Sequence, residues 1–338
     1  MTEYRRAWLY GASEQGDTPS ELIDGHYDLL MTTASWDSRC LCLLGCDVTA
    51  DSAVGVFFSN RGEGALRDSH DPKIEEFLAR AAEKSTSIRR GSDELEDLWA
   101  DLWKAVEDAA GAAGRPLRVL LDLSTCPRYF AMALIAGGFR SHLVGELVVF
   151  YADGKYPART EDDPHEPFTY GRWDTVPVPL LEGQANPGLP RHYVVSLGFE
   201  GSKTVRAVSS EGADNVTVVF PRPGVAAEYE ERTMQENRIL LADFGIAEDD
   251  VIFAPAGDAV ATWRALTEHR ARWTSDDAFY LPAGTKPHAV AMALDAMLGG
   301  DVSVMYAKPA THKETAIEPL GHYWRFTIRD LTAVRSRS

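Results

Sequence analysis

The sequence has few cysteines, no long apolar run and no signal peptide pattern, and these shortages exclude several classes of protein. No apolar run approaches the length needed to cross a bilayer, and residues 1–6 lack an apolar signal segment. Of the four cysteines, three lie in one apolar segment at 40–46, as small core residues do. We therefore expect a cytoplasmic protein with no membrane partner.

Basic residues are also in short supply. The chain has 34 Lys and Arg against 51 Asp and Glu, which gives a formal net charge of −17. A protein that coats DNA or RNA needs a basic face to neutralise phosphates, so general nucleic-acid binding is disfavoured. A small anionic ligand in a local pocket remains compatible with this charge.

Several well-known chemical motifs are missing. The loop from Gly198 to Thr204 ends in Gly-Ser-Lys-Thr after an apolar strand, but its spacing is too short for the phosphate loop of an ATPase. The sequence contains neither the dinucleotide fingerprint of dehydrogenases nor the nucleophile elbow of α/β-hydrolases. Its nine histidines are scattered, with no His-x-x-x-His. We expect no metal and no cofactor.

What the sequence does contain is an alternation of strand and helix patterns, which indicates an α/β protein. The predicted strands are 27–33, 53–58, 118–123 and 147–151, then 192–197, 216–220, 251–254, 278–281 and 302–307. The predicted helices include 40–46, 72–83, 93–110, 226–242 and 259–271. Short connections and right-handed crossovers predict mostly parallel, Rossmann-like sheets covered on both faces. A proline-rich connection at 153–190 includes an edge strand at 173–180, whose counterpart is 322–328.

One strand–turn–helix corner occurs twice. The second copy, Gly284-Thr285-Lys286-Pro287-His288, follows a buried strand and precedes a helix rich in small residues; the first copy is Ser124-Thr125-Cys126-Pro127-Arg128. Other landmarks keep nearly the same offset, among them Ser35-Trp36-Asp37 with Gly198-Phe199-Glu200. We predict an internal duplication with pseudo-two-fold symmetry, in which 1–182 forms the first Rossmann-like half and 191–338 the second.

The paired corners and loops supply the candidate ligand-binding residues. A corner before a helix directs backbone N–H groups and a positive dipole end toward a ligand beyond the carboxyl ends of the strands. The candidates are Ser35, Trp36, Asp37, Ser124, Thr125, Arg128, Phe199, Glu200, Ser202, Lys203, Gly284, Thr285, Lys286 and His288. For each hydroxyl the alternative is a simple helix cap, and for Lys203 an ordinary helix start. Trp36 and Phe199 either fill the core or stack on a base.

A Rossmann-like unit with a hydroxyl- or glycine-bearing first loop and a Gly-Thr-Lys corner resembles the CARF domains, ligand sensors of CRISPR-associated and related antiviral systems. The resemblance rests on Ala283 to Lys286 and the loops at Ser35 and Gly198. In that family two domains pair and bind a cyclic oligonucleotide, and some members cleave it. Two copies in one chain resemble the fused pair of SAVED-type sensors. The first half has Ser-Thr-Cys-Pro in place of the lysine corner, which implies a pseudo-symmetric site and an asymmetric or smaller nucleotide.

Three functions follow as hypotheses. The first is a sensor that binds a nucleotide-type anion, such as a cyclic oligonucleotide messenger of antiviral defence, in a cleft between the halves and acts on a separate effector protein. The second is an enzyme that cleaves or modifies a nucleotide or phosphorylated substrate there, with Lys286 stabilising negative charge. The third is a scaffold subunit of a defence complex with a vestigial cleft.

Overall fold

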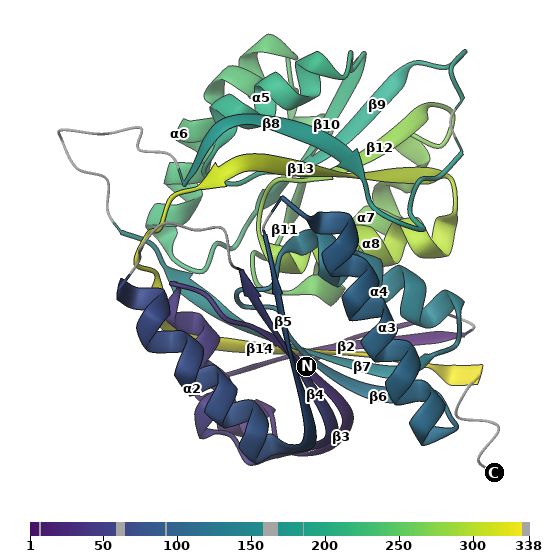
Figure 1. Ribbon diagram of the computed structural model, residues 1–338. Coiled ribbons are helices and arrows are strands. Elements are labelled where there is room, and N and C mark those ends of the chain that lie inside the picture. Colours follow the sequence, from purple (N-terminus) through teal and green to yellow (C-terminus); the bar gives the residue numbers. More distant parts are fainter. Residues whose placement is uncertain (7, 59–64, 92, 158–167, 185, 333–338) are drawn as a thin grey trace. The chain divides into compact units, whose positions relative to one another are not determined.

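The computed structural model describes residues 1–6, 8–58, 65–91, 93–157, 168–184 and 186–332. The chain divides into two compact units (Figure 1). Unit 1 comprises Met1–Leu134, Gly138–Glu166 and Glu314–Ser338, and unit 2 comprises Ile135–Gly137 and Pro167–Lys313. Each unit is built around its own sheet.

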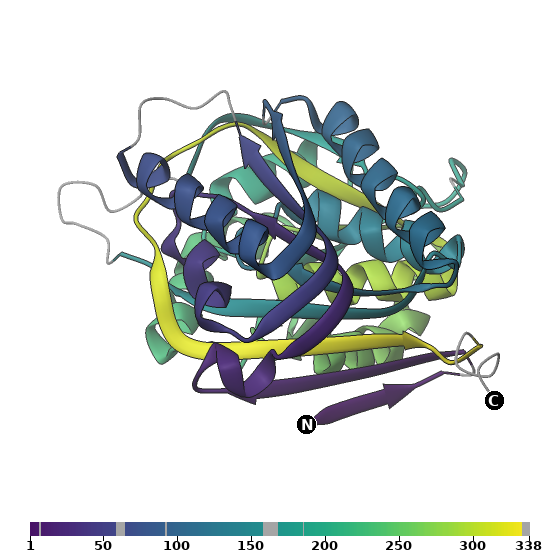
Figure 2. The same ribbon diagram turned by 60° about the horizontal axis from the view of Figure 1, so that its bottom comes forward.

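Unit 1 holds an eight-stranded sheet of order β1-β2-β14-β7-β6-β3-β4-β5. Its strands are β1 (Thr2–Arg5), β2 (Leu9–Gly16), β3 (Gly25–Thr33), β4 (Val48–Phe58), β5 (Ala82–Arg90), β6 (Leu117–Asp122), β7 (Val144–Lys155) and β14 (Glu318–Asp330). The five strands from β7 to β5 are parallel, whereas β14, β2 and β1 continue the sheet antiparallel. Figure 2 shows β14 in yellow beside the purple β2.

Helices cover both faces of the parallel strands of unit 1. They are α1 (Pro19–Leu22), the 3-10 helix η1 (Ser38–Gly45), α2 (Ala65–Ala81), α3 (Leu95–Ala113) and α4 (Arg128–Arg140). Helices η1 and α2 pack with Leu30 and Leu120 on one face, whereas α3 and α4 lie over Met31 and Leu121 on the other. The apolar stripe of α3, formed by Leu95, Leu98, Leu102 and Val106, is buried, which fixes the helix against the sheet.

Unit 2 holds a six-stranded sheet of order β11-β10-β9-β12-β13-β8. Its strands are β8 (Thr169–Pro177), β9 (Arg191–Ser196), β10 (Asn215–Pro221), β11 (Val251–Ala254), β12 (Asp277–Pro282) and β13 (Val302–His312). Its helices are α5 (Gly201–Ser210), α6 (Ala227–Asp243), η2 (Glu248–Asp250), α7 (Ala259–His269), η3 (Arg270–Arg272) and α8 (Lys286–Gly299). All strands are parallel except β8, the predicted edge strand, which runs antiparallel to β13.

Both units have the same strand order when the parallel strands are numbered along the chain. In each, the third, second, first, fourth and fifth strands are neighbours in that order, and an antiparallel strand flanks the fifth. This is the doubly wound order, in which the sequence direction reverses between the first and fourth strands. The α/β fold with mostly parallel, Rossmann-like sheets is therefore confirmed, while common descent of the halves stays a prediction.

The antiparallel strand that follows the fifth strand of one unit in the sequence belongs to the sheet of the other unit, and we call β8 and β14 the exchanged strands. Strand β8 follows the fifth strand of unit 1 but pairs with β13 of unit 2, and β14 follows the fifth strand of unit 2 but pairs with β7 of unit 1. The compact units therefore differ from the predicted division at residues 182 and 191, because 168–182 belongs to unit 2 and 314–338 to unit 1.

Candidate functional site

The carboxyl ends of β3 and β9, the first parallel strands, lead into the predicted ligand loops. In unit 1, Asp37 caps η1 and accepts hydrogen bonds from Arg39 Nε and Nη2 at 3.0 and 2.6 Å. Arg39 Nη1 donates to the Ala152 carbonyl oxygen on β7, and both charged side chains are buried. Ser35 Oγ accepts from the Asp37 backbone N–H. Asp37 and Ser35 are thus already engaged within the unit, as a buried and paired charge requires.

Trp36, between them, is partly exposed and carries an arginine on its ring. The Arg67 Cζ atom of α2 lies 5.2 Å from the ring centroid of Trp36. Arg67 Nη1 donates to the Phe58 carbonyl oxygen, where β4 ends, at 2.8 Å. The neighbouring His70 donates from Nδ1 to the Ser35 carbonyl oxygen at 2.7 Å, so α2 is held against this loop. Trp36 is therefore a partly exposed ring at the strand ends, covered on one face by Arg67.

The first corner uses its two hydroxyl groups to join strands. Thr125 Oγ1 donates to the Thr33 carbonyl oxygen at the end of β3, at 2.6 Å. Ser124 Oγ accepts from the Ala152 N–H on β7 at 3.0 Å, and Ser124 is fully buried. Arg128, partly exposed, begins α4. Both hydroxyls thus hold the ends of β3, β6 and β7 together.

The corresponding loop of unit 2 has an internally paired lysine. Lys203 Nζ lies 3.1 Å from Glu200 Oε1, and it also donates to the backbone carbonyl and hydroxyl oxygens of Thr169. Glu200 Oε1 accepts from the Thr169 N–H and hydroxyl. Ser202 is exposed in the first turn of α5. Lys203 and Glu200 therefore tie the start of β8 to α5, and the charge of Lys203 is largely balanced by Glu200.

Phe199 repeats the arrangement of Trp36. The Arg232 Cζ atom of α6 lies 4.3 Å from the ring centroid of Phe199 and 5.3 Å from that of Phe168. Tyr229 packs edge-on against Phe199. In both units, an arginine from the helix after the second parallel strand thus covers an aromatic ring in the loop after the first.

Neither arginine was among the predicted site residues. The helix that carries Arg67 was predicted to begin at residue 72, because proline favours a first helical turn. Pro72 instead lies inside α2, which begins at Ala65. The signal that could have revealed the pair is that Arg67 and Arg232 follow the matched Trp36 and Phe199 at nearly the same distance along the chain.

The second corner is packed backbone against backbone. A Cβ atom added to Gly284 would lie 2.5 Å from the Leu197 carbonyl oxygen, and one added to Gly198 would lie 2.6 Å from the Ala283 carbonyl oxygen. The Gly284 N–H donates to Ser196 Oγ at 2.9 Å. The turns after β9 and β12 therefore touch where the strand order reverses, and only glycine fits at both contacts.

The remaining candidates of this corner lie at the start of α8. Thr285 is its N-cap residue but makes no side-chain cap bond, and its buried hydroxyl has no hydrogen-bond partner among the described residues. Lys286, partly exposed, is the first helical residue. His288 is fully buried, with Nε2 at 3.1 Å from the Pro255 carbonyl oxygen. Of this corner, Lys286 therefore has the accessibility that a ligand contact needs, whereas His288 does not.

A buried carboxyl group lies near the carboxyl end of β7 in unit 1. Asp153 of β7 is 2% exposed, and its Oδ2 accepts from Trp324 Nε1 at 3.0 Å. Burial raises the pKa of this carboxyl to about 6, against the opposing effects of the Trp324 hydrogen bond, His322 and Arg39. Among the described residues, no group of three His, Cys, Asp or Glu side chains is arranged to hold a metal ion.

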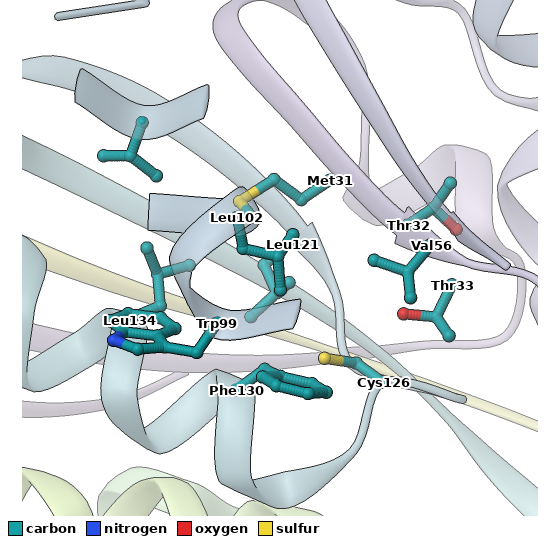
Figure 3. A pocket seen from close by; sticks show the side chains of 11 residues that line it. Met31, Thr32, Thr33, Val56, Trp99, Leu102, Leu121, Cys126, Phe130 and Leu134 are labelled. Atoms are coloured by element: carbon teal, nitrogen blue, oxygen red, sulfur yellow. The ribbon is translucent and has the colours of Figure 1, made fainter. Parts of the chain in front are cut away.

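Unit 1 also contains a small apolar cavity, shown in Figure 3. It lies between the sheet and helices α3 and α4 and is lined by Met31, Thr32, Thr33, Val56, Trp99, Leu102, Val106, Leu121, Cys126, Phe130 and Leu134. It offers about 10 Å³ to the centre of a water molecule, which is close to the least that one water needs. This cavity is a packing gap and not a ligand pocket.

Fold and site together define an α/β protein with two Rossmann-like units, each with an arginine on an aromatic ring at its strand ends. No protein-family model matches the chain, and no curated protein matches it. Among solved structures, a functionally unknown protein from Pseudomonas aeruginosa PAO1 is similar over 84% of this chain and 93% of its own, at 10% identity and a TM-score of 0.24. Within the described residues, every helix is too short or too polar to span a bilayer.

Proposed function

We propose that the protein is a ligand sensor that binds a nucleotide-type anion at the carboxyl ends of its parallel strands. The observation that carries this proposal is the arginine over an aromatic ring, Arg67 on Trp36 and Arg232 on Phe199, in equivalent places of two doubly wound units. Ligands of such sheets bind beyond the carboxyl strand ends, beside the point where the strand order reverses.

The chemistry of the pair suits a nucleotide. An aromatic ring stacks on a base whatever its identity, and a guanidinium group neutralises a phosphate with directed hydrogen bonds. Lys286 at the start of α8 adds a further cation where backbone N–H groups favour an anion. The charge of −17 leaves recognition to these local groups, so the ligand is small rather than a long nucleic acid.

The likeness of the Gly-Thr-Lys corner to CARF domains supports a messenger of antiviral defence, such as a cyclic oligonucleotide, as the ligand class. A sensor of this kind passes its signal to a separate effector protein. The proposal assigns ligand contact to Trp36, Phe199 and Lys286. It assigns structural roles to Ser35, Asp37, Ser124 and Thr125, whose polar groups already have internal partners.

Isothermal titration of the full chain against linear nucleotides and cyclic oligonucleotides tests the proposal. We expect one of them to bind, and Trp36→Ala or Phe199→Ala to weaken binding about 10-fold, since stacking contributes about 1–3 kcal/mol per base. Trp103→Ala on α3 is the control and leaves affinity unchanged. A folded protein that binds none of these ligands contradicts the proposal. Turnover of the bound nucleotide, lost in Lys286→Ala, identifies an enzyme instead.

A further inference from the structure

Arg67 has a hydrogen-bonding edge that no described residue uses. The side chain is 8% exposed, and both Nε and Nη2 are buried without a hydrogen-bond partner. These two nitrogens point their N–H groups in parallel and form the edge of a guanidinium that binds two oxygens at once. The third nitrogen, Nη1, donates to the Phe58 carbonyl oxygen.

Arg39 shows how the same edge is satisfied elsewhere in unit 1. Its Nε and Nη2 both donate to the Asp37 carboxylate, at 3.0 and 2.6 Å. The two arginines have similar burial, at 3% and 8% exposure. A buried N–H group without an acceptor carries its full desolvation cost. Arg39 avoids this cost because Asp37 accepts from its edge, whereas no described residue accepts from the edge of Arg67.

The surroundings of Arg67 favour an anion from outside the chain. Arg67 lies in the first turn of α2, where the helix dipole is positive, and it touches the end of β4 and the ring of Trp36. Burial lowers the pKa of Arg67, an effect that the charges of Asp71 and Glu314 oppose. An oxyanion that accepts hydrogen bonds from Nε and Nη2 would offset the desolvation of the Arg67 charge directly.

Resting on the proposed function, we infer that Arg67 Nε and Nη2 form a phosphoryl subsite, in which two oxygens of one phosphate of the ligand accept from the two nitrogens. The base of the same ligand then lies near Trp36, which the guanidinium of Arg67 already covers on one face. Arg67 is 8% exposed, so binding includes a local side-chain movement that uncovers this edge.

Asp71 supplies the competing explanation. It follows Arg67 by one helical turn, and its Oδ1 is also buried without a hydrogen-bond partner. A rotation of either side chain would join the two as an internal ion pair. The subsite then would not exist, and this alternative must be separated by experiment.

Substitution of the guanidinium tests the subsite in titrations with the nucleotide that binds the wild-type protein. Arg67→Lys keeps the charge but loses the two-pronged edge, so we expect affinity to fall at least 10-fold, with a similar loss in Arg67→Gln. Arg80→Lys is the matched control. Arg80 lies on the same helix, and its Cζ atom is 5.6 Å from the ring centroid of Phe77. Its Nη2 donates to the Leu44 carbonyl oxygen, but its side chain is exposed. Unchanged affinity in both Arg67 variants overturns the inference and leaves the proposed function standing.

Nuclear magnetic resonance of arginine Nε–H groups gives a second readout that does not depend on nucleotide binding. We expect inorganic pyrophosphate to shift the Arg67 resonance, assigned from its absence in Arg67→Lys, and acetate to leave it in place. A shift by pyrophosphate in a protein that binds no nucleotide supports the subsite and contradicts the proposed function. A shift by acetate alone, or a resonance that moves in Asp71→Asn but not with pyrophosphate, overturns the subsite.

Discussion

Unit 1 and unit 2 share their strand order but join the turns after the first and fourth parallel strands differently. In unit 1, a side chain makes the contact, because Thr125 Oγ1 donates to the Thr33 carbonyl oxygen. In unit 2, the backbones themselves meet at Gly198 and Gly284. A hydroxyl group bridges two turns that stay apart, whereas two glycines let them touch. The same topology therefore tolerates different chemistry where its strand order reverses.

The cations beside these turns differ in a related way. Lys203 of unit 2 is paired with Glu200, and both side chains are 15% exposed. Within the described part of the chain, Nε and Nη2 of Arg67 in unit 1 have no hydrogen-bond partner. One of these cations thus fastens a strand, whereas the other keeps a hydrogen-bonding edge without a partner among the described residues. Lys203 lies in the helix after the first parallel strand and Arg67 in the helix after the second, so the two cations differ in position as well as in role.

The largest expected effect comes from removing the exchanged strand of one unit. A chain that ends at Lys313 lacks β14, so β7 loses its antiparallel partner and the ribbon of β1 and β2 loses its attachment. We expect amide protection of β7, measured by hydrogen exchange, to fall by orders of magnitude while β9 stays protected. A chain ending at Thr332 is the control. Native protection of β7 in the shorter chain would contradict the exchange.

Next in size is the backbone contact of unit 2. Gly284→Ala places a Cβ atom 2.5 Å from the Leu197 carbonyl oxygen, so the two turns must separate. We expect the free energy of unfolding to fall by about 3 kcal/mol, as overpacking against rigid backbone does. Urea unfolding measures this, with Gly188→Ala as the control because open space surrounds Gly188. Equal stability of both variants would show that the turns do not touch.

A pH-dependent effect is expected in unit 1. Because burial raises the pKa of Asp153 to about 6, the folded state binds more protons than the unfolded state above pH 4. Stability from this group is therefore greatest at low pH and is lost as the pH rises through 6. Asp153→Asn should remove a destabilisation of up to about 3 kcal/mol at pH 7 and little at pH 4.

Urea unfolding of the wild type and Asp153→Asn at both pH values measures this difference. Asp17→Asn, at an exposed position, is the control and should follow the wild type. A difference between wild type and Asp153→Asn that is the same at pH 4 and pH 7 would exclude a raised pKa at this carboxyl group.

The smallest expected effect concerns the hydroxyl contact of unit 1. Thr125→Val keeps the shape of the side chain but removes the hydrogen bond to the Thr33 carbonyl oxygen. We expect a loss of about 1 kcal/mol in urea unfolding, the usual net contribution of one such bond. Thr125→Ser retains the hydroxyl and should recover most of it. A loss as large as that in Gly284→Ala would show that the hydroxyl contact stabilises unit 1 as much as the glycine contact stabilises unit 2.

Much of the fold was predictable from the sequence, because buried parallel strands have apolar runs and their helices have apolar stripes. The predicted strand at 27–33 corresponds to β3 and the predicted helix at 93–110 to α3. Strand β5 was not predicted, since most of its side chains are exposed at the edge of the sheet and its sequence is polar. The predicted helix at 40–46 is the 3-10 helix η1.

The candidate site was predictable at the level of loops but not of partners. The pattern placed Trp36 and Phe199 correctly after the first parallel strands of the two units. It could not tell that Lys203 is held by Thr169, because that contact depends on which sheet β8 joins. Exchange of β8 and β14 leaves no trace in strand periodicity, since each strand has the same pattern whichever fifth strand it pairs with.

The exchanged strands also constrain when each unit can complete its folding and how the gene could be divided. During synthesis β7 is made before unit 2, while β14, which pairs with it, is made after the last strand of unit 2. Unit 1 therefore finishes folding only after translation of unit 2. If the gene were split between the halves, each product would lack a strand held by the other, and the two polypeptides would be obligate partners.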